Sequence, residues 1–336
     1  MKKLILLLFI FELFFTQSMG QSVSPFQGGA YQAGLLNIRD LSYFAPDLYF
    51  YDYNYWNSSS AYYNQFGKEI SSLEIDMSPI NPEMGIKTLN LGPQESGYTN
   101  MPSIFYVSKF NLFGGKYIAA ISPVFLTSNS KMHVYTSDTS VYTSGNSGGF
   151  GDLEFMPFGV SWTFNKKVDI AFMFSVYAPT GRYKTGGDDN VGKGYWVYQF
   201  QVPTYLYFFE QAMALVVVPT FEVNGKIRDA DVRPGSRFTI EYGISQNITP
   251  WLEVEILNGH NWQLNDDSGE DVWWKDSELF TKDQCSTISF GVGFWPWQGK
   301  LNARLQYAQD YGVKQGYKSS FLTVSFLFYA NLLSNN

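Results

Sequence analysis

The chain has 336 residues, of which 18% are aromatic, and it carries a formal net charge of −7. The acidic balance argues against a nucleic-acid partner, and a single cysteine, Cys285, leaves no internal disulfide and no zinc-type cluster. After residue 20 the sequence contains no uninterrupted apolar run of about 18 residues, so transmembrane helices are not expected.

Residues 1–20 have the composition of an export signal. Lys2 and Lys3 precede an apolar run at 4–15, and small residues at 18 and 20 supply a cleavage site. A signal anchor is the alternative, but Glu12 interrupts the run, which is shorter than the about 20 residues of a spanning helix. We therefore predict a signal peptide at 1–20 and delivery to the bacterial outer membrane.

Residues 21–42 mix apolar side chains with glycine and charge, ahead of the first predicted strand. A segment of this length could fold into the lumen of a barrel as a plug, where Arg39 or Asp40 would pair with charges on the wall. The alternative is a disordered periplasmic leader.

The remainder of the chain alternates apolar and polar side chains with the period of a β-strand. In residues 237–245, Phe238, Ile240, Tyr242 and Ile244 alternate with polar or small residues. Similar alternation recurs at 251–258, 287–295, 300–309 and 318–330. Lipid outside and water or protein inside produce this pattern in a membrane barrel. Residues 117–126 and 212–223 are apolar on both faces, which suits strands whose inner face meets a plug.

The connectors alternate in length, as they do when the two ends of a barrel face different compartments. Short turns are predicted at 114–115, 165–167, 209–211, 247–249 and 296–299, between long polar stretches at 57–100, 127–151, 180–193, 225–235, 260–284 and 312–317. The pattern predicts an all-β fold, a transmembrane antiparallel up-and-down β-barrel at 43–330 of about twelve strands, followed by a tail at 331–336.

Two other folds remain open. Weak strand patterns at 73–77 and 86–91 make fourteen strands the second choice. A soluble β-sandwich or propeller also has many short strands, but the strict order of the connectors and the lack of a repeat of fixed period disfavour it.

The period of two also predicts which polar side chains line the lumen. The candidates are Asp52, Arg237, Glu241, Glu253, Glu255, Arg304 and Gln306. Two interpretations stay open and are compatible. The charges could form an ion-pair network that fills a narrow barrel, or a polar constriction that selects solutes by size and charge.

The loop at 261–283 interleaves acidic residues with tryptophans. Trp262, Trp273 and Trp274 are candidates for capturing an apolar or sugar-like ligand at the mouth of the barrel. The acidic spacing is not that of an EF-hand, so we predict no metal site and expect a solvated outer loop.

Several short segments together resemble one known family. These are 31–40, 149–152, 177–183, 189–196, 224–225, 234–235 and 266–269. Each is weakly specific turn chemistry, but in order and spacing they resemble the family labelled "putative MetA-pathway of phenol degradation" over nearly all of the mature chain. The resemblance implies an outer-membrane barrel thought to transport small, often aromatic or apolar, compounds, with no established catalytic residues. The chain departs from the usual barrel ending, because it runs past Tyr329 into 331–336.

We therefore expect an outer-membrane channel for the passive passage of small apolar or aromatic compounds, with no cofactor. Its expected partners are outer-membrane lipid, a small-molecule solute and the barrel-assembly machinery. An adhesive or structural barrel whose outer loops bind a partner is the alternative. An enzyme is a remote one, because His133 and His260 lie far apart in sequence and no nucleophile elbow is recognisable.

Overall fold

Alternating inward and outward side chains carry the chain around a barrel that closes on itself. In the computed structural model, β1 (Leu48–Tyr63) pairs antiparallel with β20 (Gly316–Tyr329), from Tyr49 opposite Tyr329 to Tyr63 opposite Gly316. On its other side β1 pairs with β5 (Glu95–Leu112). The first and last strands thus cover each other's edges, which removes the free edges of an open sheet.

The structure describes residues 28–41, 45–76, 86–90, 95–135, 140–184, 189–270, 282–296 and 300–329. The signal peptide expected at 1–20, the tail at 331–336, Trp273 and Trp274 lie outside these residues.

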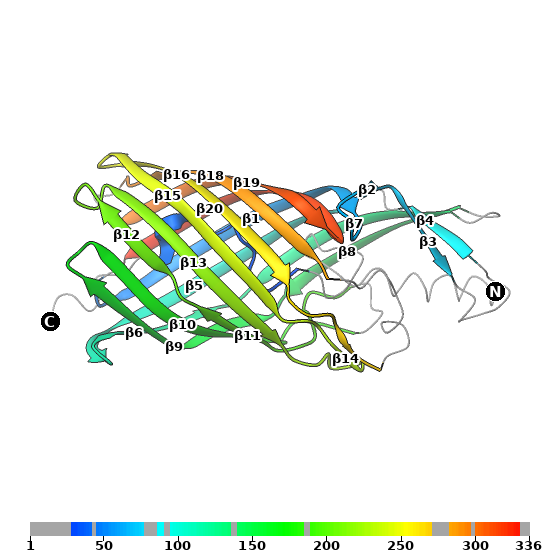
Figure 1. Cartoon of the computed structure of the whole chain (residues 1–336), viewed down its shortest axis with the longest axis horizontal. Helices are drawn as coiled ribbons and strands as arrows, with labels where there is room; N and C mark the ends of the chain where they lie inside the picture. The colour runs from blue at the N-terminus through cyan, green and yellow to red at the C-terminus, as the bar shows by residue number, and fades with distance from the viewer. Residues whose placement is uncertain are drawn as a thin grey trace.

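Twelve antiparallel strands form the barrel, as predicted (Figure 1). In order around the wall they are β1, β5, β6 (Gly115–Ser122) continued by β7 (Phe125–Tyr135), β9 (Leu153–Phe164) preceded by β8 (Ser140–Phe150), β10 (Val168–Ala178), β11 (Val197–Gln201) with β12 (Thr204–Phe208), β13 (Met213–Asn224), β15 (Arg237–Thr249), β16 (Leu252–Gln263), β18 (Gln284–Phe294), β19 (Leu301–Lys314) and β20. Pro123 separates β6 from β7, and Pro203 separates β11 from β12, because proline supplies no amide to the ladder.

The two ends of the barrel differ in their connections. At one end, the short-turn rim, tight turns use residues with positive φ, such as Phe113, Asn165 and Phe209, each at 51°. The long connections leave the other end, the long-loop rim. One connector was predicted wrongly: 312–317 is not a long loop, because β19 and β20 run to a one-residue turn at Gln315, with φ of 51°.

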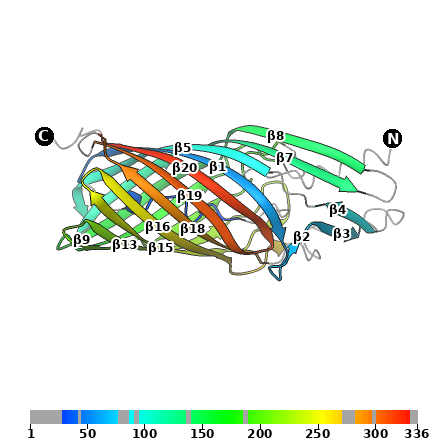
Figure 2. The same ribbon diagram turned by 90° about the horizontal axis from the view of Figure 1, so that it is seen from above.

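The strand patterns at 73–77 and 86–91 do form strands, but outside the barrel wall. The strands β3 (Ser72–Asp76) and β4 (Ile86–Asn90) pair with each other, and β4 also pairs with β7. Figure 2 shows these strands and the β7–β8 hairpin projecting past the long-loop rim. Three two-residue strands, β2 (Glu69–Ile70), β14 (Val232–Arg233) and β17 (Ser268–Gly269), lie in the long connections. The alternative of fourteen barrel strands is therefore wrong.

Large apolar side chains cover the outside of the wall. Phe290 is 55% exposed, Leu305 50% and Phe326 41%, which matches the lipid-facing band of a membrane barrel. Within the described residues, no helix has the length and apolar character to cross a membrane.

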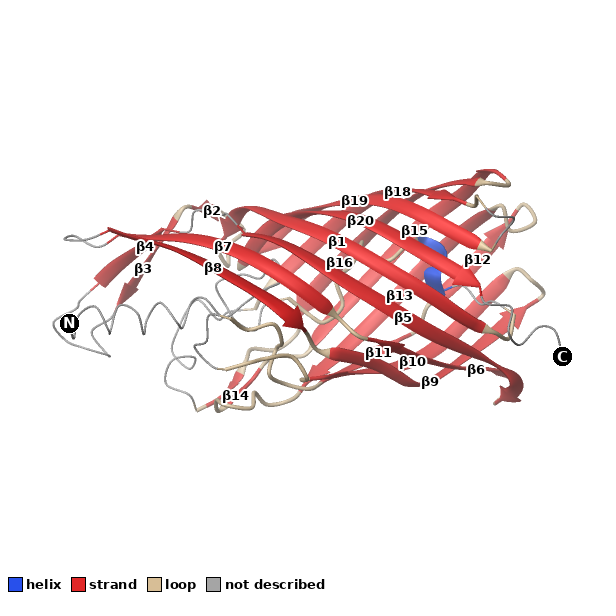
Figure 3. Cartoon of the chain, turned by 180° about the vertical axis from the view of Figure 1, so that it is seen from behind, coloured by secondary structure: helices blue, strands red, loops and turns tan. Residues whose placement is uncertain are grey.

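The chain ahead of β1 lies inside the barrel. Residues 28–41, here called the lumen segment, end in the short 3₁₀ helix η1 (Ile38–Leu41), which is the blue element within the strands in Figure 3. Ile38 packs on Val216, Val218 and Leu257 of the wall. The apolar inner face of β13 (Met213–Asn224) therefore meets the lumen segment, as its sequence suggested.

Candidate functional site: the barrel lumen

Three glutamates from neighbouring strands hold the lumen segment by its backbone. Glu222 Oε1 on β13 accepts hydrogen bonds from the amides of Ala30 (2.8 Å) and Tyr31 (3.0 Å). Glu241 on β15 accepts from the Gly34 amide (3.2 Å) and from the Tyr31 hydroxyl. These carboxylates satisfy backbone donors that would otherwise be buried without a partner.

The third glutamate, Glu255 on β16, accepts a hydrogen bond at its Oε2 from the Ile38 amide at 2.9 Å, where η1 begins. The Tyr205 hydroxyl donates to the Ile38 carbonyl at 2.5 Å. The backbone at the start of η1 is thus held by side chains of two strands, β12 and β16.

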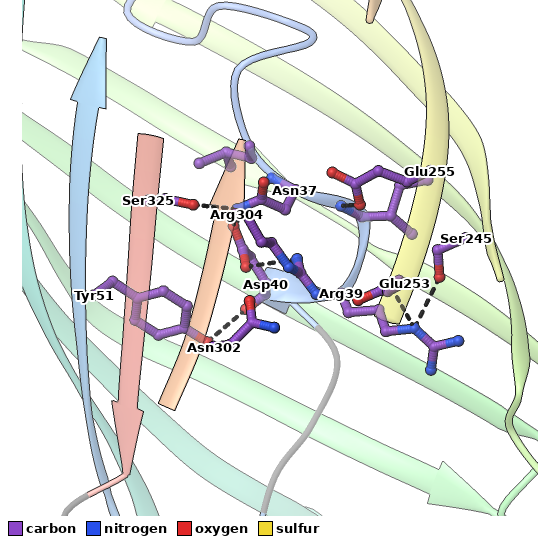
Figure 4. Close-up of polar contacts among 12 residues, drawn as sticks. Asn37, Arg39, Asp40, Tyr51, Ser245, Glu253, Glu255, Asn302, Arg304 and Ser325 are labelled. Carbon is purple, nitrogen blue, oxygen red and sulfur yellow. Dashed lines mark hydrogen bonds and ion pairs between the residues drawn. The ribbon is translucent and has the colours of Figure 1, made fainter. Parts of the chain in front are cut away.

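Charged side chains fix η1 to the wall (Figure 4). Arg39 Nε lies 2.8 Å from Glu253 Oε1, and Arg304 Nη2 lies 2.6 Å from Glu253 Oε2. Arg304 Nη1 also lies 3.3 Å from Asp40 Oδ1. We call these four residues the η1 ion network. Glu253 is its centre, because it contacts one guanidinium of the segment and one of the wall.

Asp40 has further partners in the lumen. Its Oδ2 accepts from Asn37 Nδ2 (2.8 Å) and from the Tyr53 hydroxyl (2.9 Å), and its carbonyl accepts from the Tyr51 hydroxyl (3.0 Å). Burial raises the pKa of the Asp40 carboxyl, and the Arg304 guanidinium and the Asn37 and Tyr53 hydrogen bonds oppose that shift.

Two glycines allow the lumen segment to lie close to the wall. Gly34 has a φ of +81°, and a Cβ there would lie 2.9 Å from the Thr287 side chain. A Cβ on Gly259 of β16 would lie 2.3 Å from Ala33 Cβ. Larger residues at either position would push the segment off the wall.

A cavity lies beside the lumen segment, and its side toward β1, β5, β6, β9 and β10 is largely apolar. The cavity has a volume of about 270 Å³ and extends beside the segment from Gly28 to Leu41. Leu35 and Leu36 of the segment pack against the tyrosine cluster of β1, and Leu41 packs against the cluster that contains Met156 and Met173. On its largely apolar side the cavity is lined by Tyr53, Tyr55, Met101, Phe105, Ala120, Met156 and Met173, among others.

Tyrosines of β1 line part of this side. Tyr51, Tyr53 and Tyr55 stack in a column, with ring centroids 5.8 and 6.0 Å apart. Each is buried, and the hydroxyls of Tyr51 and Tyr53 bond to Asp40. The column thus presents aromatic surface to the cavity and polar groups to η1.

A folded outer loop contacts the start of the lumen segment. Asp152 accepts from the amides of Gly181 (3.1 Å) and Lys193 (2.8 Å), which shapes the loop between β10 and β11. Lys193 Nζ then donates to the Gly28 carbonyl at 3.0 Å. Burial lowers the pKa of the Lys193 ammonium to about 8.

The structure places most of the predicted lumen-lining residues inside the barrel. Arg237, Glu241, Glu253, Glu255, Arg304 and Gln306 are all buried and face inward. All of them except Arg237 contact the lumen segment. Arg237 forms a buried ion pair with Asp283.

The prediction that Asp52 lines the lumen was wrong. Tyr51 and Tyr53 point inward, so Asp52 faces outward on the lipid side. There Asp52 accepts from Asn100 Nδ2 (2.7 Å) and Asn54 Nδ2 (3.1 Å). The inference failed because tyrosine suits lipid interfaces, whereas on β1 the tyrosine hydroxyls are needed inside.

Trp262 was also misplaced. It belongs to β16 rather than to a loop, and it faces outward, where it stacks on Phe238 and His260. Asn261 and Gln263 on either side point inward. Strand pairing with β18 extends as far as Trp262, which the polar character of the stretch concealed.

Sequence reasoning missed Glu222, Glu154 and Lys193. Glu222 is the single charged residue of β13 (Met213–Asn224). A lone charge in a strand that is apolar on both faces could have predicted that Glu222 binds a buried polar group. Glu154 and Lys193 lie at strand and loop positions whose inward direction depends on bends that the sequence does not reveal.

Comparison with known proteins gives one family and several similar structures. The family model described as "Putative MetA-pathway of phenol degradation" matches residues 87–326. The COG4313 outer membrane channel from Pseudomonas putida F1 has 13% sequence identity and a TM-score of 0.61, covering 86% of this chain and 98% of that chain. A NanC porin structure has 7% identity and a TM-score of 0.45, covering 83% and 98%. No curated protein matches the sequence.

Proposed function

The chain belongs to the family described as "Putative MetA-pathway of phenol degradation", and from that premise we propose that it is a channel of the bacterial outer membrane that lets small apolar or aromatic molecules cross passively. The observation that carries the proposal is the division of the lumen. The lumen segment engages Glu222, Glu241 and Glu255 of the charged wall. Beside the segment a cavity remains, whose side toward β1, β5, β6, β9 and β10 is largely apolar and whose other side includes Arg237, Asp283 and Asp310.

The lumen segment itself supports this choice of solute. Its backbone amides cover Glu222, Glu241 and Glu255, while its leucines face Met156 and Met173. On the side of the cavity lined by Met101, Met156 and Met173, a hydrated ion would meet methionine, leucine and tyrosine side chains, while Glu222, Glu241 and Glu255 are already engaged by the segment. An apolar solute loses no hydrogen bonds there and gains contacts with the wall.

We further propose that the lumen segment acts as a plug held by the η1 ion network. The network is buried and multiply paired, so it holds the segment in one position. Passage beyond Leu41 toward the short-turn rim then requires η1 to move.

No catalytic role is part of the proposal. His260 lies on the outer face, where its Nδ1 lies 2.7 Å from Ser286 Oγ, away from the lumen. Movement of a solute down its gradient needs neither ATP nor covalent chemistry. Export through a signal peptide and insertion by the barrel-assembly machinery complete the proposed route to the membrane.

The experiment compares entry of labelled toluene into cells that express wild-type protein or one of two matched variants. Ala120→Trp fills the cavity, since Ala120 lines it, whereas Ala303→Trp adds the same side chain on the lipid face. We expect Ala120→Trp to reduce entry to the level of cells without the protein and Ala303→Trp to leave it unchanged. Equal entry in all four strains would refute the channel and favour an adhesive barrel.

A further inference from the structure

One carboxylate of the cavity differs from the others in its partners. Four acidic side chains line the cavity: Asp152, Glu154, Asp283 and Asp310. Asp152 accepts two loop amides, Asp283 is paired with Arg237, and Asp310 accepts the Thr287 hydroxyl and the Ser319 amide. These three have clear structural roles.

Glu154 lies on the apolar wall, on the same face of β9 as Met156. Its hydrogen-bonding partners are the hydroxyls of Ser175 and Tyr177 on the adjacent strand β10. Among the described residues, no basic side chain forms an ion pair with it and no backbone amide donates to it. A carboxylate has about four acceptor positions, so Glu154 retains acceptor capacity toward the cavity.

The contrast with the opposite wall strengthens this point. Glu222, Glu241, Glu253 and Glu255 are each engaged by an amide or a guanidinium of the lumen segment. Glu154 is on the side that the segment leaves open. Glu154 is partly buried, so a further donor that reaches its free acceptor positions from the cavity stabilises it where water is scarce.

We propose that Glu154 is the polar recognition point of the cavity, and that the cavity takes a small molecule with an apolar body and a hydrogen-bond-donating head, a hydroxyl or an ammonium. This inference rests on the proposed channel function and narrows its solute class. Hydrocarbons lack the donor that Glu154 accepts, and carboxylates carry the same charge as Glu154.

The walls around Glu154 fit the apolar body. Met101, Phe105, Met156 and Met173 surround the space, and about 270 Å³ is at the lower end of small-molecule sites. Methionine side chains adapt to the shape of a bound ring. The space suits one aromatic ring with a short substituent.

The basic groups of the cavity do not offer an equivalent site for anions. Lys193 donates to the Gly28 carbonyl, and Arg237 is paired with Asp283. Lys314, the third basic residue of the lining, is exposed at the end of β19, away from Met156 and Met173. An aromatic carboxylate would therefore have to displace an existing contact. A donor head meets Glu154 without displacing any side chain or backbone partner described above.

Binding to the full-length protein in nanodiscs tests the proposal with four probes of one size: benzyl alcohol, benzylamine, toluene and benzoate. Calorimetric titration of the cavity-filled Ala120→Trp variant gives the background from partition into lipid. We expect wild-type protein to bind benzyl alcohol and benzylamine about tenfold more tightly than toluene or benzoate, as one charge-assisted hydrogen bond permits.

Variants at position 154 separate charge from hydrogen bonding. Glu154→Gln keeps a hydrogen-bond acceptor but removes the charge. It should weaken the binding of benzylamine about tenfold and change the binding of benzyl alcohol less. Glu154→Leu should bind benzyl alcohol and benzylamine no more tightly than toluene. Glu210→Gln, at the short-turn rim, is the matched control and should behave as wild type.

Two results would overturn the proposal: an unchanged order of affinities in Glu154→Leu, or benzoate bound as tightly as benzyl alcohol by wild-type protein. Either could occur while toluene still enters cells through the cavity, in which case the channel stands and the recognition role fails. Absence of binding and of entry for every probe would instead remove the channel function itself.

Discussion

At the scale of single residues, the lumen depends on charges that each satisfy more than one partner. Glu253 contacts Arg39 and Arg304, and Asp40 contacts Arg304, Asn37 and Tyr53. A buried ion pair is not in itself strong evidence of stability, but removing one partner leaves the others buried and unpaired. Losing one of these residues should therefore destabilise the docked position of the lumen segment.

Glu253→Ala should release η1 from the wall. Loss of this carboxylate leaves two buried guanidiniums without their shared partner, which costs about 3–5 kcal/mol. Arg39 should then become a site of trypsin cleavage in the folded barrel, detected by mass spectrometry. Glu210→Ala, at an exposed turn, is the control. If Arg39 is equally protected in both variants, the η1 ion network does not hold the segment in place.

The loop carboxyl Asp267 gives a prediction for pH. Burial raises its pKa to about 6, while it accepts from the Gly235 amide and Gln263 Nε2. Its folded pKa lies above its unfolded one, near 4, so the native state binds more protons in between. The stabilising contribution is therefore complete below pH 4 and is lost as pH rises through 6.

The measurement is the free energy of unfolding of wild type minus that of Asp267→Asn, followed by urea titration at several pH values. The difference should fall between pH 4 and 6 and be flat above 7. A difference that grows with pH across this window would show the opposite shift.

At the scale of elements, the lumen segment and the barrel wall have separable roles. The wall closes through the ladder between β1 and β20, which does not involve the segment. The segment is instead held by side chains from β13, β15, β16 and β19. Removing it should therefore change the lumen and leave the barrel closed.

Deleting residues 21–40 should convert a poorly conducting barrel into an open one. Glu222, Glu241, Glu253 and Glu255 would then face water, against Arg237 and Arg304. We expect at least a severalfold rise in single-channel conductance in planar bilayers and a preference for cations over anions. Conductance equal to that of the full chain would dispose of the plug, provided that heat-modifiable mobility on gels shows a folded barrel.

At the scale of the whole molecule, the outer surface must match lipid. Asp52, Asn54 and Asn100 interrupt an otherwise apolar face between Phe50 and Phe326. Their mutual hydrogen bonds reduce the cost of placing a carboxyl there without abolishing it.

Asp52→Leu should stabilise the barrel in a lipid bilayer by about 1–2 kcal/mol, since acidic residues on the lipid face cost less than the about 2–4 kcal/mol of basic ones. The same substitution at Glu253, inside the lumen, should destabilise it. Urea unfolding in vesicles distinguishes the two. A destabilised Asp52→Leu would mean that the Asp52 hydrogen bonds outweigh its exposure to lipid.

The sequence was most informative where each face of a strand meets one environment. β15 and β16 alternate cleanly between lipid and lumen, so their inward Arg237, Glu241, Glu253 and Glu255 could be placed by period alone. β1 has tyrosine on one face and polar residues on the other, and both can serve either environment. Its direction is decided by bonds from Tyr51 and Tyr53 to Asp40, which lie outside any local pattern.

The cavity could not have been derived in the same way. It depends on which wall the lumen segment adheres to, and that follows from contacts between residues about two hundred positions apart, such as Ala30 and Glu222. The acidic residues in 237–263 predicted a polar wall. No pattern near Glu154 or Met173 predicted that the lumen segment would leave a cavity beside them.

The distance along the chain between the lumen segment and its partners also has a kinetic consequence. Asp40 and Arg304 are 264 positions apart, and Ala30 and Glu222 are 192 apart. Contacts of such high sequence separation are slow to form, because the loops they close carry a large entropic cost. The β1–β20 ladder, which pairs Tyr49 with Tyr329, closes a longer loop still. The strands that receive the segment come from the second half of the chain, so the segment, although it is exported first, can dock only after those strands are in place.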